Sequence, residues 1–356
     1  MTSFLETPGV LGPFVDGNRS RAFGGGLDPF VYERVTGGLD SLYRWPSALR
    51  EVAEGLVGAA EGYAAGGHRL SAGEALRTAA RWFHFATLLP HPDRELLGRT
   101  AAEADDTMRR ALGYLDPGAA RVEGDTFAGW LRRPERGAAE GRLPLAVVIP
   151  GLDSSKEEFH GVVDALLARG AAVCAIDGPG QGVRAATSRK RADYQVVVAE
   201  LLDSLEDAHP DLETRSAGLV GMSLGGYYAT VSAAHDPRVR AAVAVSGPYF
   251  LTWDELPLFV TDTLTLRCGS AGAAREFARG VDLRDVAGGL RCPLLVVEGG
   301  TDVVPGVANG VGLSAAVPDG TLLTVPHGDH LVGNARADWL PATADWVVDH
   351  LTSARG

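Results

Sequence analysis

The chain has 356 residues, of which 46% are hydrophobic and 22% are charged, and its formal net charge at pH 7 is -12. A chain of this length and composition can bury a sizeable core in one large or two modest globular domains. The acidic balance argues against nucleic acid or an anionic membrane as the main partner, because both select basic surfaces.

The first residues, the hydropathy and the cysteines indicate neither export nor a membrane span. Residues 1–8 have no basic start and no apolar run, so we expect no signal peptide. No run of 18 or more apolar residues is present. Cys174, Cys268 and Cys292 are an odd number without paired spacing, which favours buried free thiols in a reducing compartment. We therefore expect a cytoplasmic protein.

Helical periodicity dominates residues 1–118, which we predict to form an N-terminal arm and helical domain. The first 38 residues are rich in Gly, Pro and aromatic side chains, and we expect an ordered arm without long elements. Helix-spaced apolar residues predict three helices, over residues 39–63, 71–90 and 92–115. Ser71, with Glu74 three residues on, forms a capping-box pattern at the start of the second.

From residue 119 onward, short runs of Val, Leu and Ile alternate with helical segments. The apolar runs that predict strands cover residues 126–131, 145–149, 171–176, 217–220, 241–245, 293–297 and 321–325. This alternation indicates an α/β fold with a mostly parallel sheet and helices on both faces. A last helix is expected over residues 335–351. We therefore predict a catalytic domain over residues 119–356.

Residues 247–290 interrupt this alternation. The segment is rich in aromatic side chains, among them Tyr249, Phe250, Trp253 and Phe259. A connection of this length inside a compact domain is usually functional. We expect it to cover the substrate together with the N-terminal helices.

The segment Gly221-Met222-Ser223-Leu224-Gly225 matches the G-x-S-x-G pattern of a nucleophile elbow. An apolar strand precedes it and a helix-like stretch follows it, so Ser223 is expected on a sharp turn at a strand end. A serine hydroxyl becomes an effective nucleophile when an adjacent imidazole takes its proton. We therefore predict that Ser223 is the nucleophile; the alternative is an ordinary strand-to-helix turn residue.

The partners of Ser223 are expected at later strand ends, because ligands bind at the carboxyl ends of parallel strands. Asp302 and His330 each follow one of the last two predicted strands, and the order Ser, Asp, His is that of an α/β-hydrolase triad. Glu298 remains an alternative acid and His327 an alternative base. A metal pair of His327 and His330 lacks a third ligand of suitable spacing, so we predict no metal and no cofactor.

An acyl-transfer site also needs hydrogen-bond donors for the developing oxyanion. The amide of Leu224, directly after the nucleophile, is one candidate. The other is the amide of Leu152 in the loop after the second predicted strand, where Gly151 permits a close approach of the backbone. For Asp153 and Ser154 the simpler interpretation is that they cap the following helix.

Residues 177–182 read Asp-Gly-Pro-Gly-Gln-Gly and raise the question of a nucleotide site. They fail the dinucleotide fingerprint, because Val183 stands where its third glycine is required. We predict a tight strand-to-helix turn that lines the substrate pocket.

Taken together, four segments resemble the α/β-hydrolases: residues 177–182, 221–226, 300–305 and 328–330. More narrowly, Gly151-Leu152-Asp153-Ser154-Ser155-Lys156-Glu157-Glu158 after a helical N-terminal region is similar to the 2,6-dihydroxypseudooxynicotine hydrolase-like group, near which the polyketide-shortening pigment hydrolases and tetronate-pathway hydrolase-like proteins belong. The resemblance implies an α/β-hydrolase fold with an N-terminal helical lid. It also implies hydrolysis of a carbon–carbon bond next to a ketone by Ser, His and Asp in a homodimer.

Members of this group also use a carboxylate from the segment after the sixth strand. The resemblance therefore implies a substrate-binding role for Glu255 or, one residue earlier, for Asp254. Trp253, Tyr249 and Gly151 are expected beside it in the same pocket. The alternative for Glu255 is an exposed surface acid.

Three functions stay open. The first is serine-dependent hydrolysis of a carbon–carbon or ester bond in a medium-sized, polyketide-like small molecule. The second is a lyase of the same fold that eliminates acetate from an O-acetylated tetronate or polyketide intermediate, as some proteins that resemble this one do. The third is a non-catalytic ligand-binding protein, against which the complete triad argues.

Overall fold

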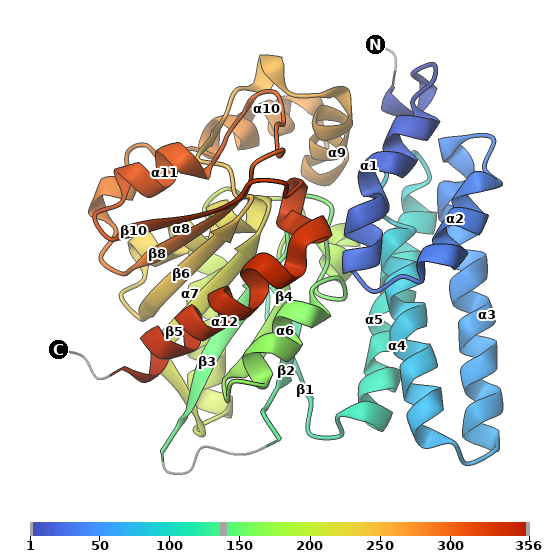
Figure 1. Cartoon of the computed structure of the whole chain (residues 1–356), viewed down its shortest axis with the longest axis horizontal. Helices are drawn as coiled ribbons and strands as arrows, with labels where there is room; N and C mark the ends of the chain where they lie inside the picture. The colour runs from blue at the N-terminus through green and yellow to red at the C-terminus, as the bar shows by residue number, and fades with distance from the viewer. Residues whose placement is uncertain (1–2, 136–140, 354–356) are drawn as a thin grey trace.

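The computed structural model describes residues 3–135 and 141–353 and places a mostly parallel sheet beside a group of helices (Figure 1). The N-terminal helices are α1 (Leu11–Gly24), α2 (Pro29–Gly37), α3 (Trp45–Ala65), α4 (Arg69–Phe85) and α5 (Arg94–Leu115), with the 3-10 turns η1 (Phe4–Glu6) and η2 (Leu42–Arg44). Helix α4 packs against both α3 and α5. The three predicted helices are thus confirmed, with ends shifted by up to six residues.

The expectation of an arm without long elements is wrong, because its residues form α1 and α2. Gly12 and Gly17 lower the intrinsic helix propensity of α1, which hides it from a propensity-based prediction. Tertiary packing overrides this preference: Phe14 and Ala22 are buried in an aromatic core with Trp45.

Capping chemistry explains the start of α2 but not that of α4. Asp28 begins α2, because its carboxylate accepts a hydrogen bond from the Val31 amide at 2.9 Å. The capping box expected at Ser71 and Glu74 is wrong, since α4 already begins at Arg69 and both residues lie within its first turns. Burial of the next apolar stripe, rather than a side-chain cap, holds this helix end.

The sheet has the strand order β1-β2-β4-β3-β5-β6-β8-β10. Its strands are β1 (Ala120–Glu123), β2 (Ala128–Arg132), β3 (Leu143–Ile149), β4 (Ala172–Asp177), β5 (Leu212–Met222), β6 (Val239–Val245), β8 (Leu294–Gly299) and β10 (Gly320–Val325). All neighbours are parallel except β1 with β2 and β2 with β4, which are antiparallel. The mostly parallel sheet is therefore confirmed, with one unpredicted edge strand, β1.

Helices cover both faces of this sheet (Figure 1). Helices α6 (His160–Leu167) and α12 (Arg336–Thr352) pack on one face, and α7 (Gln195–Ala208) and α8 (Leu224–His235) pack on the other. Because both faces are covered, the central strands are apolar over most of their length rather than alternating. Helix α11 (Gly310–Ala316) follows β8 and precedes β10 in the sequence, and it contacts both strands.

The insertion at residues 247–290 is built of short elements above the carboxyl end of the sheet (Figure 1). They are β7 (Phe250–Leu251), η4 (Trp253–Glu255), α9 (Leu258–Cys268), α10 (Ala271–Gly280) and η5 (Ala287–Gly289). Strand β7 pairs with β9 (Val307–Ala308) in the loop after β8. The Phe259 ring of α9 lies 5.2 Å from that of Phe4 and 5.6 Å from that of Phe14, so the insertion contacts the N-terminal region.

Two smaller features belong to this level of the structure. The three cysteines are buried and free, as predicted. Among the described residues, no helix combines the length and the apolar character that crossing a membrane requires.

Candidate active site

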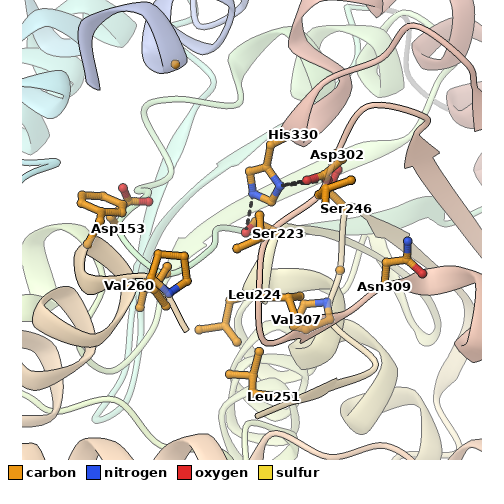
Figure 2. A pocket seen from close by; sticks show the side chains of 18 of the residues that line it. Asp153, Ser223, Leu224, Ser246, Leu251, Val260, Asp302, Val307, Asn309 and His330 are labelled. Atoms are coloured by element: carbon orange, nitrogen blue, oxygen red, sulfur yellow. Dashed lines mark hydrogen bonds and ion pairs between the residues drawn. The ribbon is translucent and has the colours of Figure 1, made fainter. Parts of the chain in front are cut away.

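Three strand ends bring Ser223, Asp302 and His330 together (Figure 2). Ser223 lies between β5 and α8, Asp302 follows β8, and His330 follows β10 and opens the turn η6 (His330–Ala335). His330 Nε2 lies 3.0 Å from Ser223 Oγ, and His330 Nδ1 lies 2.9 and 3.1 Å from the two carboxylate oxygens of Asp302. This arrangement fixes the imidazole with Nε2 facing the serine.

The turn at Ser223 is a strained strand-to-helix connection. Its φ of 54° and ψ of -125° lie in a region that residues with a Cβ rarely adopt. Gly221 and Gly225 make the turn possible, because a Cβ on Gly221 would lie 1.9 Å from the Gly225 carbonyl oxygen. The sharp reversal places the Ser223 side chain at the end of the sheet, next to the cavity.

The two alternative triad residues lie elsewhere. Glu298 accepts a hydrogen bond from the Gly310 amide at 2.7 Å, and burial raises its pKa to about 7. Its Oε2 has no hydrogen-bond partner among the described residues, although Glu298 does line the cavity. His327 is exposed and pairs with Asp338 at 3.0 Å. Neither alternative is hydrogen-bonded to Ser223, Asp302 or His330, the three residues that we call the relay.

Opposing effects set the ionisation of the relay. Burial alone would raise the pKa of Asp302, but the hydrogen bond and charge of His330 and a hydrogen bond from Ser246 lower it. Burial alone would lower the pKa of His330, but the hydrogen bond and charge of Asp302 raise it. His330 keeps 42% of its side chain accessible because it faces the cavity, whereas Asp302 keeps 8%.

A cavity of about 390 Å³ opens beside Ser223. Its walls are mainly apolar and come from Leu152, Leu224, Pro248, Leu251, Pro257, Phe259, Val260, Leu264, Val303, Val304 and Val307. Helix α1 contributes Gly17, Asn18 and Arg21 to the same lining. A cavity of this size and polarity fits a medium-sized, largely apolar ligand with a few polar groups near the serine.

The two predicted oxyanion donors both lie at the cavity beside Ser223. Leu152 and Leu224 both line the cavity, and neither amide donates a hydrogen bond to another residue in the described part of the chain. Gly151 brings the two backbones together, since a Cβ on it would lie 3.0 Å from Ser223 Cβ and 3.4 Å from the Leu224 nitrogen. Gly151 itself does not line the cavity.

The predicted substrate contacts in the insertion are not brought to the cavity. Trp253, Asp254 and Glu255 form the turn η4, and both acids are exposed. The cause is the β7–β9 pairing, which turns Leu251 and Val307 towards the cavity and leaves η4 outside it. Tyr249 is also absent from the lining. For Glu255 the structure therefore favours the surface acid.

The segment at residues 177–182 does not line the cavity either, so that prediction is wrong. Its residues are fully buried, and the Gln181 side chain donates hydrogen bonds to the backbone carbonyls of Pro150 and Gly151. The segment thus supports the loop after β3 instead of touching the ligand.

Sequence reasoning missed Arg21 of α1. Its guanidinium donates to Asp153 at 2.9 Å, to Ser154 at 3.0 Å and to both oxygens of Glu158 at 2.6 and 2.8 Å. Asp153 and Ser154 are therefore not helix caps, and α6 begins only at His160. The available signal was the unbroken polar run at residues 153–158, whose burial demands partners from another segment.

No group of three or more His, Cys, Asp or Glu residues is arranged to hold a metal ion within residues 3–135 and 141–353. A serine hydroxyl hydrogen-bonded to an imidazole, with two unpaired amides next to an apolar cavity, is an arrangement that acyl transfer can use.

Comparison with known proteins places this site in a family. Residues 144–267 match the family described as "Serine aminopeptidase, S33". The chain is 31% identical over 347 residues to the 2,6-dihydropseudooxynicotine hydrolase of Paenarthrobacter nicotinovorans, with 92% of this chain and 91% of that protein covered. It is 33% identical over 226 residues to the alpha/beta hydrolase gkaG of Penicillium citrinum, and there the match spans about half of the relative's length, 52%.

A solved structure agrees with these sequence matches. The crystal structure of the 2,6-dihydroxy-pseudo-oxynicotine hydrolase superposes with a TM-score of 0.81 at 28% identity, covering 94% of this chain and 95% of that one. The chain is an enzyme that belongs to the α/β-hydrolases and, within them, to the group of the 2,6-dihydropseudooxynicotine hydrolase. The resemblance drawn from the sequence motifs is thereby confirmed.

Proposed function

We propose that this enzyme is a serine hydrolase that cleaves a carbon–carbon bond next to a ketone, or an ester bond, in a medium-sized, polyketide-like metabolite. One observation carries the proposal: the hydrogen-bonded path from Asp302 through His330 to Ser223 ends in an apolar cavity. The relationship to a protein named 2,6-dihydropseudooxynicotine hydrolase supports the hydrolysis of a small-molecule metabolite.

The geometry supports the following sequence of steps. Ser223 Oγ attacks the substrate carbonyl while His330 Nε2 takes its proton, and the Asp302 carboxylate stabilises the resulting imidazolium. The Leu224 and Leu152 amides hold the oxyanion of the tetrahedral intermediate. The intermediate then expels the leaving carbanion or alkoxide, which receives the proton from His330, and leaves an acyl-enzyme. Water activated by His330 releases the acid and restores Ser223.

Covalent labelling tests the nucleophile. A fluorophosphonate should form an adduct on Ser223, located by mass spectrometry of the digested protein. Ser223→Ala should not react, and Ser232→Ala is the matched control, since Ser232 is a buried serine whose hydroxyl donates to the Tyr228 carbonyl within α8. An adduct on any other residue, or no adduct, would overturn the assignment.

Isotope incorporation separates hydrolysis from elimination. Candidate ketones and esters are screened for cleavage, and a cleaved compound is then turned over in ¹⁸O water. Hydrolysis through an acyl-enzyme places one ¹⁸O in the released acid. Release of unlabelled acetate with formation of a double bond would instead identify a lyase of the same fold.

A further inference from the structure

The buried segment at residues 177–182 packs against the loop after β3 and supports it. Within that segment, Gln181 is 1% exposed, and its side-chain nitrogen donates to the carbonyl oxygens of Pro150 and, at 3.0 Å, of Gly151. Its side-chain oxygen accepts from the Gly178 amide and the Tyr194 hydroxyl, both at 2.9 Å. The Gln181 amide therefore has two donated and two accepted hydrogen bonds, which fix its orientation.

The glycines of the segment make this contact possible. A Cβ on Gly178 would lie 2.2 Å from the Tyr194 hydroxyl, and Gly180 has a φ of 71°. With other residues at these positions the turn could not pack against Tyr194. The close-packed turn is thus shaped to hold the Gln181 side chain against the loop.

A second buried donor reaches the same carbonyl. Lys190 is 7% exposed, and its Nζ lies 3.4 Å from the Gly151 oxygen and 5.8 Å from the centre of the Tyr228 ring. Burial lowers the pKa of Lys190 to about 7, and the nearby charge of Arg267 acts in the same direction. Gly151 O is the only hydrogen-bond acceptor of this amino group in the described part of the chain.

The geometry of a peptide unit links this carbonyl to the active site. The Gly151 carbonyl and the Leu152 amide belong to one planar unit, in which C=O and N–H point in opposite directions. Fixing the oxygen therefore fixes the direction of the Leu152 hydrogen. Donors on the oxygen also polarise the unit, which strengthens its N–H as a donor.

We propose that Gln181 and Lys190 are positioning residues of the oxyanion hole, which aim and polarise the Leu152 amide by holding the Gly151 carbonyl. The inference rests on the proposed function, since it assigns a task to the Leu152 amide during acyl transfer. It also gives a role to the Asp-Gly-Pro-Gly-Gln-Gly segment, which the mechanism leaves unused.

The test compares Gln181→Met and Lys190→Met with the wild type. The readouts are the rate of Ser223 phosphonylation by a fluorophosphonate, and kcat and KM for a p-nitrophenyl ester. Because loss of an oxyanion donor costs about 10²- to 10³-fold in kcat, we expect Gln181→Met to lose about 10- to 100-fold in both rates. KM should stay within about threefold, and Lys190→Met should show a smaller loss of the same kind.

Thr230→Val is the matched control, because it removes a buried hydrogen bond to a backbone carbonyl on α8 without touching the loop after β3. It should keep wild-type rates. Wild-type rates in Gln181→Met, or a loss confined to KM, would overturn the inference while the labelled wild type still supports the proposed function. If Gln181→Met does not fold, Lys190→Met decides in the same way. An unlabelled wild type would instead contradict the proposed function itself.

Discussion

At the residue scale, Ser223 is both the proposed nucleophile and a residue with a strained backbone. Its φ and ψ are disfavoured for any residue with a Cβ, and strain of this kind costs about 1–3 kcal/mol. Glycine adopts such angles freely but loses about 0.5–1 kcal/mol through its greater entropy in the unfolded chain. The strain at Ser223 is therefore expected to exceed this loss.

We accordingly expect Ser223→Gly to be more stable than Ser223→Ala by about 1 kcal/mol, although both lose activity by about 10⁴-fold or more. Urea unfolding of the two variants measures the difference. Ser232→Gly against Ser232→Ala, within α8, should show the reverse order, because glycine destabilises a helix. A Ser223→Gly variant less stable than Ser223→Ala would contradict the strain.

The relay makes a second prediction, about pH. In the proposed mechanism the active form of His330 is neutral, so we expect kcat/KM to fall as the pH drops through the pKa of His330. Asp302 raises that pKa, whereas burial lowers it. In Asp302→Asn the effect of burial prevails and lowers the pKa of His330. The acidic limb of the kcat/KM profile should therefore move to lower pH, while the plateau rate falls about 10⁴-fold.

An NMR titration of the His330 ring provides the same measurement without turnover. His327→Ala is the control, since His327 pairs with Asp338 outside the relay and should leave the profile unchanged. An acidic limb that stays in place or moves to higher pH in Asp302→Asn would refute the coupling.

The convergence of Ser223, Asp302 and His330 was predictable, whereas the positions of the expected substrate contacts were not, for a physical reason. Ser223, Asp302 and His330 each follow a strand, and parallel strands bring their carboxyl ends to one edge. The direction in which Asp254 and Glu255 point depends on the β7–β9 pairing, and that pairing joins segments far apart in the sequence. No local sequence pattern can therefore predict the β7–β9 pairing.

At the element scale, one buried polar network joins the N-terminal helices to the loop after β3. Arg21 of α1 and His84 of α4 both contact Glu158, and Lys156 bonds Asp105 of α5 at 2.8 Å. Arg21 lowers the pKa of Glu158 far below its ordinary value, against the effect of burial. The loop was recognisable in the sequence, but its partners stand more than 40 residues before it and carry no motif.

Removing one member of this network should be costly. Arg21→Met leaves Asp153 and Glu158 buried without their cation, and breaking a buried pair in this way costs about 3–5 kcal/mol. The double variant Arg21→Met/Glu158→Gln should recover a large part of that loss, as a thermodynamic cycle of unfolding free energies would show. Arg99→Met is the control, because its ion pair with Glu95 is exposed and contributes little. Strict additivity of the two buried substitutions would contradict the coupling.

At the scale of the whole molecule, the cavity lies between parts that are far apart in the chain. Helix α1 supplies Asn18 and Arg21 to its lining, and α9 supplies Phe259, Val260 and Leu264. The division near residue 118 stays a prediction, as do the homodimer and the cytoplasmic location. The sequence indicated that both the helical region and the insertion would cover the substrate. It could not show how they meet, because that contact depends on the packing of Phe259 against Phe4 and Phe14.

This arrangement predicts in which helices a bound ligand should slow amide hydrogen exchange. Filling the cavity replaces solvent by contacts on α1 and α9, so a bulky fluorophosphonate adduct on Ser223 should slow amide hydrogen exchange in both helices. Helix α3 supplies no residue to the cavity lining and lies on the far side of the helical region (Figure 1), so its exchange should stay unchanged. A methylphosphonyl adduct too small to reach α9 is the matched control and should protect neither helix. Equal protection of α3 would indicate a general stabilisation of the fold, and no protection of α1 would mean that the N-terminal region does not enclose the substrate.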